Sequence, residues 1–151
     1  MITNLTTAIL MTTNWSINEW RFLIWLAGGI HIAIILANIP LPRKLQVKRN
    51  LAGVPIFIRQ VFYVHWLYIV LTVGLFAVLC FAFARDLAGA TPMGRFLSAF
   101  VAAFWLLRLV LQRFFYDPQL RREIPWMDAA YQLALVMLIG IFTVAAAHPM
   151  H

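Results

Sequence analysis

Four stretches of the chain are apolar over the length that a membrane-spanning helix needs. A hydrocarbon core about 30 Å thick takes roughly 20 helical residues. Runs of this length with few charges predict spans over residues 20–39, 56–84, 95–115 and 128–147. Prolines mark the boundaries: Pro40 closes the first span, Pro55 opens the second and Pro125 precedes the fourth, because proline cannot continue a helix but is tolerated in its first turn. The pattern therefore predicts an all-α, integral membrane protein.

The segments between these runs are short, and no repeat of 20–50 residues is present. Residues 1–151 are therefore interpreted as one four-helix transmembrane domain. Short connections place successive helices side by side in opposite directions, which predicts an up-down-up-down bundle. Because Pro55 lies ahead of the second span, that helix is expected to begin outside the bilayer, with Arg59 reaching back to the interface.

Lysines and arginines divide unequally between the two sides of this bundle. Residues 40–59 and 113–127 hold eight of them, and the opposite side holds three. The eight are Arg43, Lys44, Lys48, Arg49, Arg59, Arg113, Arg121 and Arg122, and the three are Arg21, Arg85 and Arg95. Cytoplasmic loops are enriched in such residues, so both basic loops are predicted to be cytoplasmic and both termini to lie outside.

Composition removes other classes of protein. The chain is 64% hydrophobic and 11% charged, whereas soluble domains are about 45–50% apolar and about 25% charged. A soluble enzyme, a disordered tail and a disulfide scaffold are excluded, the last because Cys80 is the single cysteine. The net charge of +7 lies in loops between apolar runs rather than in an aromatic-lined patch, so it indicates lipid head groups and not nucleic acid.

Small residues recur every four positions in the first span, at Gly29, Ala33 and Ala37, and again in the third at Ala99 and Ala103. Such stripes let another helix approach closely. We expect both to pack inside the bundle rather than to form a dimer face.

Polar residues inside the predicted spans are few, and each is costly in hydrocarbon unless it has a role. By helix rise, His31 lies about 13 Å and His65 roughly 8–15 Å from the cytoplasmic ends of their spans. Helix phase turns His31 away from Gly29, onto a face with Gly28. The other members of this expected polar cluster are Gln60, Trp105, Arg108, Gln112, Asp128 and Gln132. All four helices thus contribute to one half of the membrane, where Arg108 is expected to pair with Asp128.

Two imidazoles at similar depth on adjacent helices suggest axial ligands to a haem b in an electron-transfer subunit. In this hypothesis His31 and His65 bind the iron, Gly28 leaves room for the macrocycle, Trp105 lines the site and Arg108 meets a propionate. The same pair would suit a chlorophyll-type pigment. A divalent metal at His31 and His65 is a weaker alternative, because only the more distant Asp128 offers a third ligand.

Two other interpretations remain open. Each histidine can simply bond to a neighbouring helix, which makes the chain an accessory subunit of a larger membrane complex or a homo-oligomer. A small oligomeric transporter or channel would use the same polar groups as a path. No P-loop, nucleotide fingerprint, nucleophile elbow or zinc motif is present, so the sequence favours a non-enzymatic role and assigns no catalytic residue.

Three stretches, WLAGGIHI, RQVFYVHWLYIVLT and FWLLRLVLQRFFYD, carry a resemblance to a family of small bacterial four-helix inner-membrane proteins. The resemblance spans about residues 25–117 and implies four helices and a bacterial inner membrane, with no activity attached. The positions that carry it are His31, Arg59, Gln60, His65, Trp105, Arg108 and Gln112. The first span is also faintly similar to the copper-resistance D and four-helix protoporphyrinogen oxidase families. This sequence lacks their further histidines and later helices, so neither function is transferred.

Overall fold

The computed structural model describes residues 17–44, 46–115 and 125–147, and those residues are mostly helical with no strand among them. Four long helices account for most of the chain: α2 (Ile17–Asn38), α5 (Ile56–Ala82), α6 (Pro92–Phe115) and α8 (Pro125–Ala147). Each is long and apolar enough to cross a membrane. The predicted all-α class, with four helices long and apolar enough to span a membrane, is therefore confirmed.

Prolines set several of the helix ends. Pro92 and Pro125 occupy the first positions of α6 and α8, where the missing N–H leaves no further donor unpaired. These helices therefore begin three residues before the spans expected from hydropathy. Asn38 ends α2, and its side-chain amide donates to the Ile34 carbonyl at 2.7 Å, which satisfies one of the last carbonyls before Pro40.

Three short elements connect the long helices. The loop after α2 contains α3 (Leu41–Lys44) and α4 (Val47–Asn50), and a π-helical turn η1 (Asp86–Ala90) joins α5 to α6. Gly89 in this turn has φ 95°, a conformation that a side chain disfavours. A Cβ at Gly94 would collide with the Asp86 carbonyl, so glycine is needed where α6 leaves the turn.

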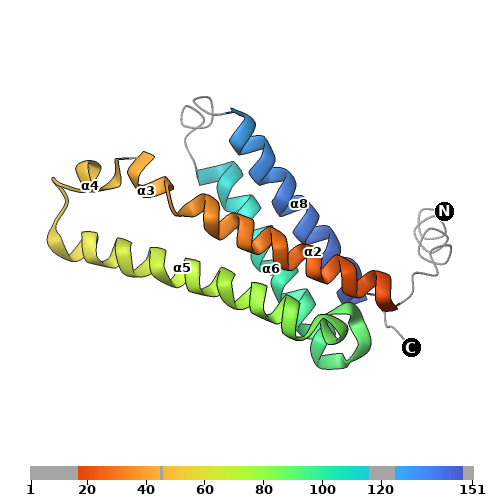
Figure 1. Cartoon of the computed structure of the whole chain (residues 1–151). Helices are drawn as coiled ribbons and strands as arrows, with labels where there is room; N and C mark the ends of the chain where they lie inside the picture. The colour runs from red at the N-terminus through yellow and green to blue at the C-terminus, as the bar shows by residue number, and fades with distance from the viewer. Residues whose placement is uncertain (1–16, 45, 116–124, 148–151) are drawn as a thin grey trace.

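The long helices form two pairs, α2 with α5 and α6 with α8, which come together near η1 and diverge toward the other end (Figure 1). Arg95 near the start of α6 donates to the Ala146 carbonyl of α8 at 3.0 Å, and Ser98 donates to the Leu87 carbonyl at 2.7 Å. These bonds fasten α6 to the end of α8 and to η1.

Both stripes of small residues face outward, so the expectation that they pack inside the bundle is wrong. Gly29, Ala33 and Ala37 are exposed, as are Ala99 and Ala103. The side of α2 that packs instead carries Ile24, Ala27, Gly28, His31 and Ile34, all buried. The regular spacing of small residues therefore does not mark the buried face of α2.

Candidate functional site

Two polar residues of the described part of the chain, His31 and Ser98, have no exposed surface, and His31 lies at the centre of the bundle. Its Nδ1 lies 2.6 Å from the Ala27 carbonyl, and the indole Nε1 of Trp105 donates to its Nε2 at 3.0 Å. A carbonyl only accepts and an indole N–H only donates, so Nδ1 carries the proton and Nε2 accepts. His31 is therefore a neutral imidazole with both ring nitrogens bonded, and its predicted orientation away from Gly29 is confirmed.

Aromatic rings from the other three long helices surround this imidazole. The ring centroids of Phe76, Trp105 and Phe142 lie 5.8, 5.4 and 6.1 Å from that of His31. Phe104 closes the cluster with edge contacts to Phe76 at 5.1 Å and Trp105 at 5.2 Å. Each long helix thus contributes a ring to one buried centre, which we call the His31 cluster.

His65 lies apart from this cluster, exposed on α5. Phe76 is the α5 residue that contacts His31, and His65 precedes it by eleven positions, an axial distance of about 16 Å. The structure therefore does not bring the two histidines together. A bis-histidine haem needs a free ring nitrogen from each side of the iron, and Nε2 of His31 is occupied by Trp105. The residues present do not fit a haem shared by His31 and His65.

Gly28, expected beside a macrocycle, serves a different contact. A Cβ at this position would lie 2.9 Å from the Phe81 ring and 3.0 Å from the Cys80 side chain. Both neighbours belong to α5, so Gly28 permits the close approach of α2 and α5.

A second polar cluster joins α6 and α8. The Gln112 amide donates to Asp128 Oδ1 at 2.9 Å, and the Gln132 amide donates to Oδ2 of the same carboxylate. One turn earlier on α6, the Arg108 guanidinium lies 5.8 Å from the centre of the Tyr131 ring of α8. The structure therefore brings four of the sequence-predicted residues together here, while Gln60 lies exposed on α5.

The sequence analysis missed Phe76, Phe142 and Tyr131, because aromatic residues are common in apolar helices and only the register between helices selects these three. In the described part of the chain, no three His, Cys, Asp or Glu side chains are grouped to hold a metal ion. The chemistry of both clusters is hydrogen bonding between helices. Neither presents an activated nucleophile.

Comparison of the chain with known protein families, with curated proteins and with solved structures finds no match. Nothing in these comparisons bears on the resemblance to small bacterial four-helix membrane proteins.

Proposed function

We propose that this chain is a non-enzymatic subunit of a larger membrane protein complex, and that it contacts its partner through the first half of α5. One observation carries the proposal. Residues 56–70 extend beyond the end of α2 (Figure 1). Their apolar side chains are exposed around most of the helix.

Contacts between α2 and α5 fix how far this extension reaches. Gly28 lies against Cys80 and Phe81, and Gly74 lies against Ile35, so the two helices run in opposite directions. Asn38, three residues after Ile35, is thus level with about Leu71, three residues before Gly74. The preceding 15 residues of α5, counted from its start at Ile56, extend roughly 22 Å further.

Large apolar side chains cover this extension, and their exposed fractions run from 42% to 73%. They are Ile56, Phe57, Ile58, Val61, Phe62, Val64, Leu67 and Ile69. Burying such a side chain is worth about 1.5–3 kcal/mol relative to leaving it in water. Lipid or another protein must therefore cover this half of α5.

Three arginines indicate how much of the first half of α5 can lie in the lipid hydrocarbon. Arg21, Arg85 and Arg95 mark the ends of α2, α5 and α6 near η1. We place one edge of the hydrocarbon core at these arginines. A core of about 30 Å, or roughly 20 helical residues, then reaches back along α5 from Arg85 to about His65. In this placement both basic loops, 40–59 and 113–127, lie on the cytoplasmic side of a bacterial inner membrane, the helices cross it up-down-up-down, and both termini are outside.

Ten residues at the start of α5, Ile56–His65, then lie beyond the hydrocarbon. They extend roughly 15 Å, and the head-group layer accounts for about 5–8 Å of this. Phe57, 73% exposed, is the most exposed apolar side chain of this segment. We therefore expect an apolar surface of a partner subunit to bury this segment on the cytoplasmic face of the membrane.

The two polar clusters support a scaffold role. The ring nitrogens of His31 are both bonded, and both oxygens of the Asp128 carboxylate accept hydrogen bonds from glutamine amides. These hydrogen bonds hold the side chains of the two clusters in place. The accessory-subunit interpretation therefore has more geometric support than haem binding or transport.

Photo-crosslinking in host membranes tests the proposal. A photoreactive phenylalanine analogue replaces Phe57, and the matched control replaces Phe96, which is similarly exposed at 67% but lies on α6. We expect irradiation to give a discrete protein adduct at position 57 and only lipid adducts at position 96. The proposal would be overturned if position 57 gave no protein adduct, or if the two positions gave equal adducts. An adduct of twice the chain mass would also overturn it, because the partner would then be a second copy of this chain.

A further inference from the structure

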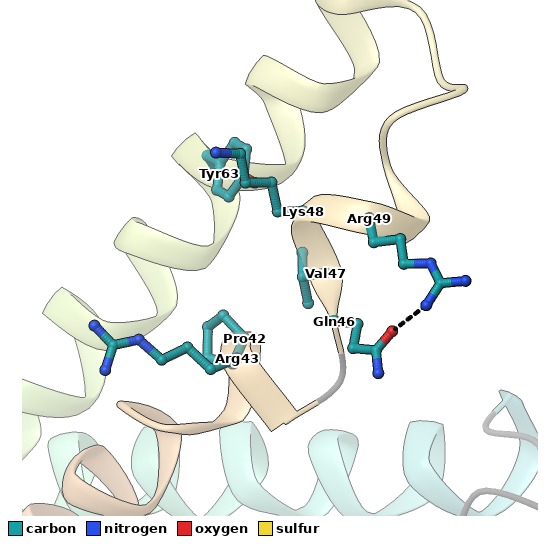
Figure 2. Close-up of a pocket in the computed structure, with 7 residues that line it drawn as sticks. All are labelled: Pro42, Arg43, Gln46, Val47, Lys48, Arg49 and Tyr63. Atoms are coloured by element: carbon teal, nitrogen blue, oxygen red, sulfur yellow. Dashed lines mark hydrogen bonds between the residues drawn. The ribbon is translucent and has the colours of Figure 1, made fainter.

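The loop between α2 and α5 folds around an open hollow of about 430 Å³. Three elements line it: α3 and the following turn supply Pro42, Arg43 and Gln46, α4 supplies Val47, Lys48 and Arg49, and α5 supplies Tyr63. Figure 2 shows Arg43 reaching along the α5 side, Lys48 extending toward Tyr63, and Arg49 extending to the opposite side.

Backbone geometry at Gln46 creates this arrangement. Gln46 has φ 47°, a left-handed conformation that turns the chain sharply between α3 and α4. Its side-chain oxygen accepts a hydrogen bond from the Arg49 guanidinium at 3.2 Å (Figure 2). The turn therefore places Arg43 and Lys48 around one hollow and braces Arg49 at its edge.

The charge around the hollow has one sign. Arg43, Lys44, Lys48, Arg49 and Arg59 lie in this loop and the first turn of α5, and the sequence has no Asp or Glu between Glu19 and Asp86. No carboxylate from this stretch is available to neutralise these cations. An anion supplied from outside the chain is the natural counter-charge, and arginine and lysine both bind phosphate oxygens strongly.

Depth identifies the source of that anion. Arg43 follows Arg21 by 22 residues, which corresponds to about 33 Å if the rise of a helix is used throughout. This distance slightly exceeds the hydrocarbon thickness of about 30 Å. The hollow therefore lies in the layer of lipid head groups.

An apolar path leads from the hollow back toward the hydrocarbon. Tyr63, Leu67 and Val70 share one face of α5 at positions i, i+4 and i+7. Leu67 is 51% exposed. This face offers a seat for an acyl chain directly below the basic hollow.

We propose that the hollow binds the phosphate group of an anionic phospholipid, with Arg43 and Lys48 holding the phosphate and the Tyr63–Leu67 face of α5 holding an acyl chain. The proposal does not depend on the partner-subunit function, because every residue it uses belongs to this chain. It differs from a general attraction of basic loops to the membrane in requiring particular cations.

Native mass spectrometry of the full chain in detergent tests it, with phosphatidylglycerol, phosphatidylcholine and inorganic phosphate as probes. The test variant is Arg43→Gln/Lys48→Gln. The control, Lys44→Gln/Arg59→Gln, removes the same charge from residues outside the lining. We expect the test variant to weaken phosphatidylglycerol binding at least tenfold and the control to weaken it less than twofold, with little phosphatidylcholine bound by any form.

Equal losses in the two variants would overturn the site, since they would show that net charge alone attracts the lipid. Displacement of the lipid by millimolar inorganic phosphate would overturn the lipid assignment in favour of a free anion. A photoreactive phosphatidylglycerol provides a readout that needs no charge variant. It should label the Tyr63–Leu67 segment of the unaltered protein, and labelling elsewhere alone would contradict the proposal.

Discussion

At the scale of single residues, the sequence predicted where His31 points but not what it bonds. Helix phase is sufficient to place His31 on the side of α2 away from Gly29, because it depends on one helix only. The partner of Nε2 depends on the axial register and tilt of α6 against α2, which the sequence pattern does not encode. Trp105 was therefore expected beside a cofactor, and the structure places its indole N–H directly on the imidazole.

Replacing Trp105 with phenylalanine should destabilise the protein, because Nε2 of His31 would remain buried without its donor. We expect a loss of about 1–2 kcal/mol in the free energy of unfolding, measured by denaturation in mixed micelles. Trp126→Phe is the matched control, since Trp126 is 71% exposed. Equal stability of the two variants would show that the hydrogen bond contributes nothing.

Loss of the negative charge at Asp128 should also lower the free energy of unfolding. In Asp128→Asn one acceptor oxygen becomes an amide donor that faces another donor from Gln112 or Gln132. Hydrogen bonds to charged groups contribute about 1.5–3 kcal/mol, so we expect a loss of at least about 1 kcal/mol in the same assay. The exposed Gln60 provides the control variant Gln60→Leu. A stabilised Asp128→Asn would contradict the assigned bonds.

At the scale of helices, the number of long helices followed from hydropathy and proline positions, whereas the packed faces did not. The regular spacing of Gly29, Ala33 and Ala37 marks a surface that another helix can approach, but it carries no information on whether one does. Gly28, one residue away, makes the close contact with α5. Shape complementarity between two specific helices selected it.

Two adjacent glycines on α2 therefore give a matched pair of variants. Gly28→Leu should separate α2 from α5 and reduce the free energy of unfolding by about 1–3 kcal/mol, the usual cost of overpacking. Gly29→Leu should change stability little, since a Cβ there meets nothing within 4 Å. Equal effects, or a larger effect at Gly29, would show that the outward stripe and not Gly28 is a packed interface.

The η1 turn was not predicted, because a π-helical turn between two apolar helices has no periodic signature. Gly89→Ala should cost about 1–2 kcal/mol, the penalty for a side chain at a left-handed φ. Gly53→Ala serves as the control, because a Cβ at Gly53 lies in open space. The free energies of unfolding of the two variants are compared. An unchanged stability of Gly89→Ala would show that the left-handed φ at Gly89 does not require glycine.

At the scale of the whole molecule, composition and proline positions predicted a membrane protein whose second helix begins ahead of the bilayer. They did not predict that the helix pairs diverge, because divergence depends on where the pairs touch, near η1 (Figure 1). They also predicted that His31 and His65 lie at similar depth. In the structure, the register between α2 and α5 places His31 beside Phe76, eleven residues after His65. The proposed site of action consequently moves from the interior of the bundle to the exposed start of α5.

The depth of α5 in a bilayer tests this account most directly. In a Cys80→Ala background, which removes the single cysteine, spin labels are introduced one at a time from Phe57 to Val78 and the purified protein is placed in liposomes. Relative accessibility to oxygen and to a water-soluble nickel complex then reports depth. The account predicts an oxygen maximum near Leu75, midway between His65 and Arg85, and no hydrocarbon signature at Phe57. A hydrocarbon signature at Phe57 would show that lipid covers the whole helix, and it would remove the reason to propose a partner.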